Sequence, residues 1–177
     1  MIKLLNLLKE ENKILVPRRS AEERQKNYII ATQKKIQQYI KDGSKGNLDL
    51  YGTPITQLPN NLKVGGYLDL YGTPITQLPN DLTVGGNLDL YGTSITQLPD
   101  NLTVGGDLYL SGTSITQLPN DLKVGGYLDL YGIPITQLPN DLKVGGNLNL
   151  KNTPLSKKYT KEQIKQMVPG VKGNIYL

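Results

Sequence analysis

Cysteine and histidine are both absent from the 177 residues, and each absence excludes a kind of chemistry. Without cysteine the chain forms no disulfide and offers no thiolate nucleophile, which fits a reducing compartment, although secreted proteins can also lack cysteine. Without histidine it lacks the side chain that most often serves as general base or metal ligand near neutral pH. We therefore expect no catalytic residue of these kinds, no metal site and no cofactor.

Long apolar runs are missing as well. No stretch is long enough to cross a bilayer, so we expect no membrane partner. Residues 1–16 are apolar in patches but are broken by four charged residues between positions 9 and 13, and no small-residue cleavage site follows them, so we expect no signal peptide. No glycine-rich loop ending in Lys-Ser or Lys-Thr is present to bind phosphate.

The chain consists mainly of one twenty-residue unit that occurs five times without a change of length. The first copy, residues 45–64, reads KGNLDLYGTPITQLPNNLKV. The other copies begin at Gly65, Gly85, Gly105 and Gly125, and the last ends at residue 144. A fixed period of this length is typical of a solenoid, in which each unit buries its apolar side chains only by stacking on its neighbours.

Each copy has the pattern of a short strand followed by an irregular return. Leu48 and Leu50 alternate with polar neighbours, as in a strand with one buried face. Pro59 prevents a helix later in the copy, and the pair Gly65-Gly66 permits a tight corner that side chains would block. We therefore predict an α/β solenoid with about seven short parallel strands in one sheet. The predicted strands are 48–50, 68–70, 88–90, 108–110, 128–130, 148–150 and 175–177.

Two regions flank the five copies. Residues 1–44 are predicted to be a helical extension, with helices over 2–9 and from Ser20 to about Lys41, whose stripe of Ile29, Ile36 and Ile40 covers the first copy. Residues 45–177 form the solenoid, with regular copies over 45–144 and an irregular C-terminal turn over 145–177. In that turn a second capping box, Thr160 to Gln163, predicts a helix over 161–168.

The spacing Leu68-x-Leu70-x-x-Thr73-x-Ile75 and the step Gln57-Leu58-Pro59 resemble leucine-rich repeat proteins, over about residues 45–177. The copies look like the short bacterial subtype found in secreted enterobacterial effectors. Some of those effectors carry a ubiquitin-ligase domain with a catalytic cysteine, and this chain has no cysteine to match it. The flanks MIKLL, LVPRRS and NTPLSKKYT also resemble small leucine-rich repeat proteins of tailed, marine-type bacteriophages. That resemblance implies a location in the cytoplasm of a host cell or in the virion.

In such a solenoid the polar strand positions share the concave face, and here they are mostly tyrosine and aspartate. Neighbouring strands lie about 4.8 Å apart, so Asp49, Asp69 and Asp89 should form a stacked row. Their mutual repulsion would be relieved by a cation or a basic partner, and tyrosine is favoured in recognition surfaces. The candidate binding residues, which we call the Tyr/Asp face, are Asp49, Tyr51, Tyr67, Asp69, Tyr71, Asp89, Tyr91, Tyr109, Tyr127, Asp129 and Tyr131.

These features predict a non-enzymatic protein-binding or scaffold module that recognises a macromolecular partner, a basic protein or a glycan, through the Tyr/Asp face. Three alternatives remain open at this stage. The face could be a solvated surface copied by duplication, the protein could be a structural accessory component of a larger assembly such as a phage particle, or the aspartate row could belong to a glycan-acting enzyme.

Charge along the chain is segregated. Residues 1–44 carry ten Lys or Arg against five acidic residues, residues 45–144 carry four Lys against nine Asp, and residues 145–177 carry six Lys against one Glu. A nucleic-acid partner is not favoured, because the basic residues before position 44 have few aromatic or glycine-rich neighbours. We expect a monomer with weak end-to-end self-association through the strand at 175–177.

Overall fold

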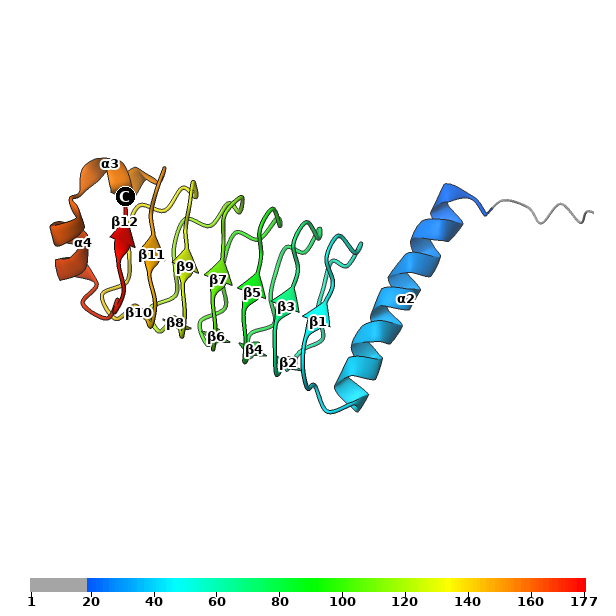
Figure 1. Ribbon diagram of the computed structural model, residues 1–177. Helices are drawn as coiled ribbons and strands as arrows, with labels where there is room; N and C mark the ends of the chain where they lie inside the picture. The colour runs from blue at the N-terminus through cyan, green and yellow to red at the C-terminus, as the bar shows by residue number, and fades with distance from the viewer. Residues whose placement is uncertain (1–18) are drawn as a thin grey trace, which may run out of the picture.

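The twenty-residue copies stack into a parallel-strand solenoid in the computed structural model, which describes residues 19–177 (Figure 1). The predicted sheet of seven parallel strands is confirmed, and equivalent residues of neighbouring copies pair in register, as Leu48 does with Leu68. We call this sheet A. Its strands, in spatial order, are β1 (Leu48–Asp49), β3 (Leu68–Asp69), β5 (Leu88–Asp89), β7 (Leu108–Tyr109), β9 (Leu128–Asp129), β11 (Leu148–Asn149) and β12 (Ile175–Tyr176).

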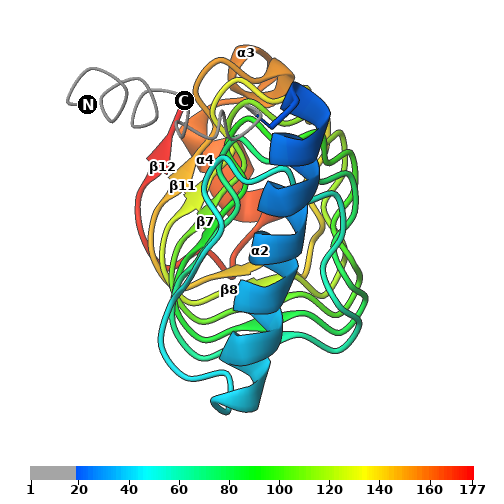
Figure 2. The ribbon, with the colours of Figure 1, turned by 90° about the vertical axis from the view of Figure 1, so that its right-hand side faces the viewer.

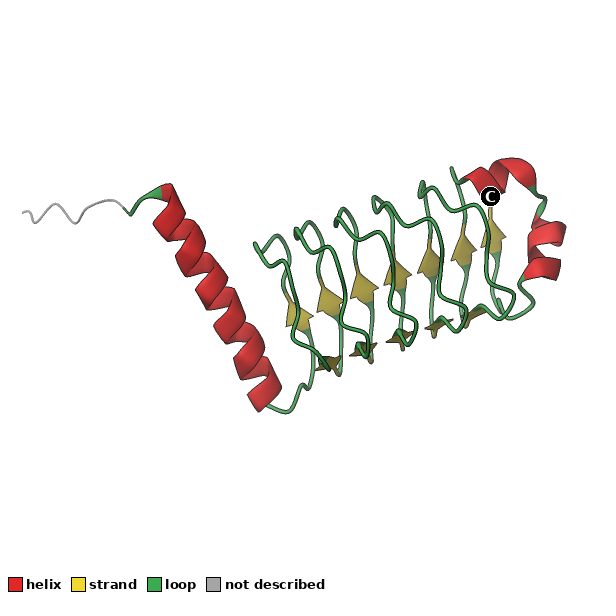
Figure 3. Cartoon of the chain, turned by 180° about the vertical axis from the view of Figure 1, so that it is seen from behind, coloured by secondary structure: helices red, strands yellow, loops and turns green. Residues whose placement is uncertain are grey.

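A second parallel sheet, which the sequence did not lead us to expect, runs along the lower edge of the solenoid in Figure 3. This sheet B has five strands, and each turn contributes one exposed and one buried residue to it, such as Lys63 and Val64. Two residues are too few to show an alternating pattern in the sequence. The strands are β2 (Lys63–Val64), β4 (Thr83–Val84), β6 (Thr103–Val104), β8 (Lys123–Val124) and β10 (Lys143–Val144).

Paired glycines make the corner between sheets B and A. The amide of Gly86 donates to the carbonyl oxygen of Gly66 over 2.9 Å, and this bond recurs from turn to turn. A Cβ atom on Gly86 would lie 2.8 Å from the carbonyl carbon of Gly66, closer than real Cβ atoms approach other atoms. The corner therefore excludes side chains because neighbouring backbones touch there, as the sequence suggested.

The core consists of rows of identical apolar side chains, one row for each buried position of the copy. Leu48, Leu50 and their equivalents are almost completely buried. Beside them, the hydroxyl of Thr53 donates to the carbonyl oxygen of Leu50 over 2.8 Å, and the equivalent threonines do the same where they occur. Ile133 replaces threonine in the fifth copy and is fully buried, so the row tolerates an apolar member.

Helix α2 (Ala21–Lys41) stands at the N-terminal side of the solenoid and crosses its first turn, as Figure 2 shows. Its N-terminal capping box at Ser20 is confirmed. Ile36 packs into the core, but Ile40, predicted to share its stripe, is exposed. The buried side of the helix is formed by Thr32 and Ile36 instead. Near its end, the hydroxyl of Tyr39 lies 2.8 Å and 2.9 Å from the carbonyl oxygens of Ser44 and Gly46. The helix predicted over 2–9 lies outside the described residues.

Two short helices, α3 (Pro154–Lys158) and α4 (Lys161–Met167), cover the other side of the solenoid (Figure 1). The predicted helix over 161–168 is confirmed as α4, with its capping box at Thr160. Helix α3 was missed, although Thr153 followed by Pro154 is a recognised helix start. Ile164 of α4 is fully buried, so the irregular turn closes the core.

Candidate binding face

Sheet A places all eleven residues of the Tyr/Asp face on one side of the solenoid. Because side chains alternate along a strand, Leu48 and Leu50 point into the core while Asp49 and Tyr51 point outward. The register pairs Asp49 with Asp69 and Asp69 with Asp89. Tyr109 takes the next place in this row, and Asp129 follows it. The aspartate row is therefore interrupted once.

Three tyrosines form a continuous stack beside the aspartates. The ring centroids of Tyr51 and Tyr71 are 5.1 Å apart, and those of Tyr71 and Tyr91 are 4.9 Å apart at an interplanar angle of 7°. Their side chains remain 60%, 37% and 45% exposed. The stack ends at Ser111, a buried residue that takes the place of tyrosine in the fourth copy. The result is a flat aromatic ledge open to solvent.

The aspartates also have a structural role that sequence reasoning missed. The Oδ1 atom of Asp69 accepts a hydrogen bond from the backbone N–H of Tyr71 over 2.9 Å, and Asp49, Asp89 and Asp129 bind the equivalent N–H groups. Asn149 does the same for Lys151 without a charge. The signal was present in the sequence, since Asp two residues before a turn N–H commonly caps that turn. One carboxylate oxygen of each aspartate is thus committed to the fold.

The centre of the face holds a partly desolvated pair, Tyr67 and Asp89. The hydroxyl of Tyr67 donates to Oδ2 of Asp89 over 3.4 Å. Burial, followed by the charge of Asp69, raises the pKa of Asp89 above its ordinary value, and the hydrogen bond from Tyr91 opposes this only in part. Burial and the two carboxylates also raise the pKa of Tyr67 well above 10.0. Tyr67 is therefore a neutral hydrogen-bond donor at every physiological pH.

Two further tyrosines of the face pack against each other rather than joining the stack. The rings of Tyr109 and Tyr127 meet edge to face with centroids 6.1 Å apart. The hydroxyl of Tyr109 donates to Asp107 over 3.0 Å, and burial together with this carboxylate raises the pKa of Tyr109 to about 12. Burial and the charge of Asp129 raise the pKa of Tyr127 as well. Asp107 belongs to this cluster, although it is not among the eleven candidate residues of the Tyr/Asp face.

At Ser111, where the tyrosine stack ends, the side chains form hydrogen bonds with one another. The hydroxyl of Ser111 donates to Oδ2 of Asp129 over 2.9 Å, and the side-chain amide of Asn149 donates to Oδ1 of the same carboxylate over 2.8 Å. Tyr131 stands apart from the stack and accepts a hydrogen bond from Asn152 over 2.7 Å. The face therefore has an open aromatic half around Tyr71 and a half around Asp129 that is internally bonded.

Within residues 19–177 no three acidic, histidine or cysteine side chains lie close enough together to hold a metal ion. In the same part of the chain no helix is both long and apolar enough to cross a membrane. Comparison with protein-family models, with curated proteins and with solved structures gave no match.

Proposed function

We propose that the protein is a non-enzymatic binding module whose Tyr/Asp face takes up a basic segment of a protein partner. The observation that carries this proposal is the exposed stack of Tyr51, Tyr71 and Tyr91 beside an aligned row of carboxylates. A lysine or arginine side chain can lay its aliphatic stem along the ring edges and place its charged head on a carboxylate. Both halves of such a side chain thus find a partner on one surface.

The electrostatics of the face favour a cationic partner. Asp49, Asp69 and Asp89 occupy adjacent places in the register, so each carboxylate lies next to another of the same charge. The raised pKa of Asp89 reflects the free-energy cost of keeping that carboxylate ionised. A bound guanidinium or ammonium group would offset this cost, whereas an anionic partner would increase it.

A peptide of about ten residues with alternating arginine and serine tests this function by fluorescence anisotropy at low salt. We expect Asp69→Asn with Asp89→Asn to weaken binding roughly fivefold to thirtyfold, the loss of two partly exposed ion pairs. The matched control is Asp121→Asn with Asp141→Asn, which removes the same charge from exposed positions outside the face. Equal weakening by both pairs would show that only net charge matters, and the proposal would fail.

We also infer that the solenoid is a leucine-rich repeat variant of the short bacterial kind and that it comes from a tailed bacteriophage. Support for the first part comes from the turn length of about twenty residues, the Leu-x-Leu strands and the Leu-Pro step of each copy. Support for the second is the sequence of the flanks. Finding the gene among phage structural genes would strengthen this origin, and finding it among chromosomal housekeeping genes would contradict it.

A further inference from the structure

We propose that the loop side of the solenoid is a second binding surface, which takes up a linear neutral polysaccharide along the axis of the repeat. This side lies in front of sheet A in Figure 3. We call the surface the amide trough. One wall is the row Gln57, Gln77, Gln97, Gln117 and Gln137, the other is Asn60, Asn80, Asp100, Asn120 and Asn140, and the floor between them is the leucine and proline at positions equivalent to Leu58 and Pro59.

The first observation is that two exposed polar positions have the same residue in all five copies, while other exposed positions differ. Lys63 becomes Thr83, Pro54 becomes Ser94, and Tyr51 becomes Ser111, so exposed positions have diverged since duplication. Thr56 and Gln57 are exposed and polar, yet both are identical in all five copies. The other identical positions are apolar leucine, isoleucine and valine, glycine or proline, whose packing or backbone explains them. Shared ancestry alone does not explain why these two exposed side chains are unchanged in every copy, when residues of the Tyr/Asp face have changed.

The second observation is that the glutamines are not used by the fold. The side-chain hydrogen bonds among residues 19–177 serve the Tyr/Asp face, the helix caps, the turns and the contacts of α2 with the solenoid, and none involves these five glutamines. Each amide therefore keeps one acceptor and two donor positions for solvent or a ligand. A glutamine amide that makes no hydrogen bond within the protein can bind ligand groups that both donate and accept hydrogen bonds, as hydroxyl groups do.

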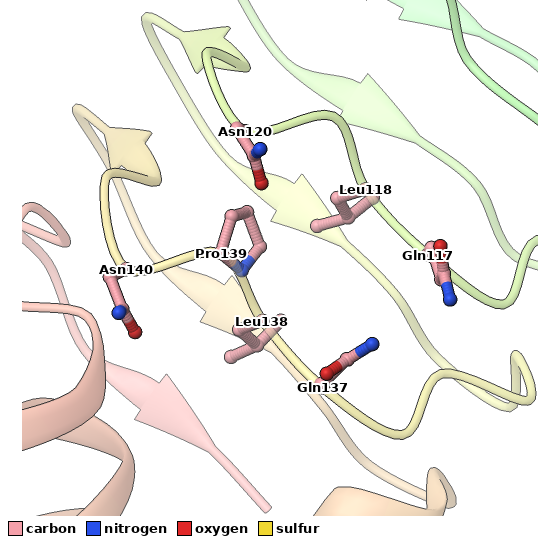
Figure 4. A pocket seen from close by; sticks show the side chains of 7 residues that line it. All are labelled: Gln117, Leu118, Asn120, Gln137, Leu138, Pro139 and Asn140. Atoms are coloured by element: carbon pink, nitrogen blue, oxygen red, sulfur yellow. The ribbon is translucent and has the colours of Figure 1, made fainter.

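The third observation is the shape of the trough. Figure 4 shows Gln117 and Gln137 on one side of a hollow, Asn120 and Asn140 on the other, and Leu118, Leu138 and Pro139 between them. The volume of this hollow is about 290 Å³. Two equivalent hollows between earlier turns have volumes of about 280 Å³ and 230 Å³. A surface that repeats the same hollow between successive turns from the second to the fifth copy fits a ligand that also repeats, because every additional unit adds a contact without a new association step.

The small number of charged residues in the trough favours a neutral polymer. Asp100 is the only charged residue that lines these three hollows, and no lysine or arginine lines them. Phosphate, sulfate or uronate groups would find no cation there, which argues against nucleic acids and acidic glycans. A neutral hexose chain matches both parts of the trough, since its C–H faces can lie on leucine and proline while its hydroxyl groups meet the amides.

Four soluble, linear and neutral polymer series test the proposal: malto-, isomalto-, manno- and cello-oligosaccharides of two to six units, titrated into the intact chain by calorimetry. We expect one of them to bind and its affinity to rise with chain length. Gln97→Leu with Gln117→Leu should weaken that binding roughly tenfold to a hundredfold, because several hydroxyl–amide hydrogen bonds are lost. Circular dichroism and the melting temperature verify that the variant is folded.

The control is Tyr71→Ala with Tyr91→Ala, which alters the Tyr/Asp face and should leave polysaccharide binding unchanged. Conversely, the glutamine variant should bind the arginine–serine peptide as the native chain does, so the two proposals can fail separately. Absence of binding to all four polymers would overturn the amide trough as a polysaccharide site. Binding that the glutamine variant retains and the tyrosine variant loses would also overturn it and would move the glycan to the Tyr/Asp face.

Discussion

At the scale of single residues, Asp89 has two opposing effects on the stability of the fold. Its Oδ1 atom caps the turn by accepting the N–H of Tyr91 over 2.8 Å, which stabilises the fold. Its charge is partly removed from water and lies in register with Asp69, which destabilises the fold. Asn149 performs the same capping without a charge, so the sequence itself shows that the two contributions can be separated.

We predict that Asp89→Asn is more stable than the native chain at pH 7. An ordinary aspartate titrates near 3.8, and the folded pKa of Asp89 is higher. Between these two values the folded state binds more protons than the unfolded state, so native stability falls as the pH rises through that window and remains lower above it. The advantage of the variant should therefore be present at pH 7 and lost below the ordinary aspartate pKa.

Urea denaturation at pH 7 and at about pH 3.5 measures this difference. Asp49→Asn is the matched control, since Asp49 caps the same kind of turn but is exposed at the edge of sheet A. We expect the control to change stability less at pH 7. A variant at position 89 that is less stable than the native chain at pH 7 would contradict the prediction.

At the scale of elements, helix α2 is attached to the solenoid mainly through its C-terminal half. The hydroxyl of Tyr39 also accepts the N–H of Gly65 over 3.2 Å, and Lys35 donates to the backbone carbonyl of Asp49 at the edge of β1. Further toward the N-terminus, a hollow of about 160 Å³ remains between Ile29, Thr32 and the first turn at Ile55. The helix therefore contacts the first turn more closely through its C-terminal half than near Ile29.

We predict that Ile36→Ala destabilises the protein by about 2–4 kcal/mol, because a fully packed side chain leaves a cavity. Ile36 is 2% exposed and belongs to the core, whereas Ile30 on the same helix is 39% exposed. Ile30→Ala is thus the matched control and should change the free energy of unfolding by less than about 1 kcal/mol. Chemical denaturation of both variants decides the matter: if they lose equal stability, α2 does not pack on the solenoid through Ile36.

At the scale of the whole molecule, charge is arranged along the axis. The turn and helices over 145–177 carry six lysines and one glutamate, whereas the five regular copies carry more aspartate than lysine. Strand β12 pairs with β11, and helix α4 packs beside it with a hollow of about 380 Å³ between them. Two protein molecules that met end to end through their lysine-rich C-terminal regions would repel each other.

We predict that the 177-residue chain is monomeric at low salt and associates weakly as salt screens this repulsion. The screening length falls from about 30 Å at 0.01 M to about 3 Å at 1 M ionic strength, so the repulsion should disappear over this range. Light scattering across a salt series measures the average mass. A stable dimer at low salt, or an unchanged monomer at high salt, would contradict the prediction.

The sequence by itself determined those features that depend on one copy or on local geometry. A constant period of twenty residues requires stacking, alternating leucines require a strand, and capping boxes at Ser20 and Thr160 start helices wherever they stand. Glycine at the corner could be understood without the structure, because a side chain there would meet the backbone of the preceding turn. The location of the Tyr/Asp face followed from the same alternation.

Only the tertiary structure decided the features that depend on contacts between turns. Sheet B exists because stacking aligns two-residue segments that carry no strand pattern of their own. The buried face of α2 holds Thr32 rather than Ile40, and Tyr39 ties the end of the helix to residues 44 and 46, neither of which helical periodicity describes. Asp89 is costly to ionise because burial removes its carboxylate from water and because the charge of Asp69 lies beside it. The amide trough forms because glutamines from separate turns stand in line. Except for the tether of Tyr39, these features depend on residues about twenty positions apart in the chain, which meet only when the solenoid has formed.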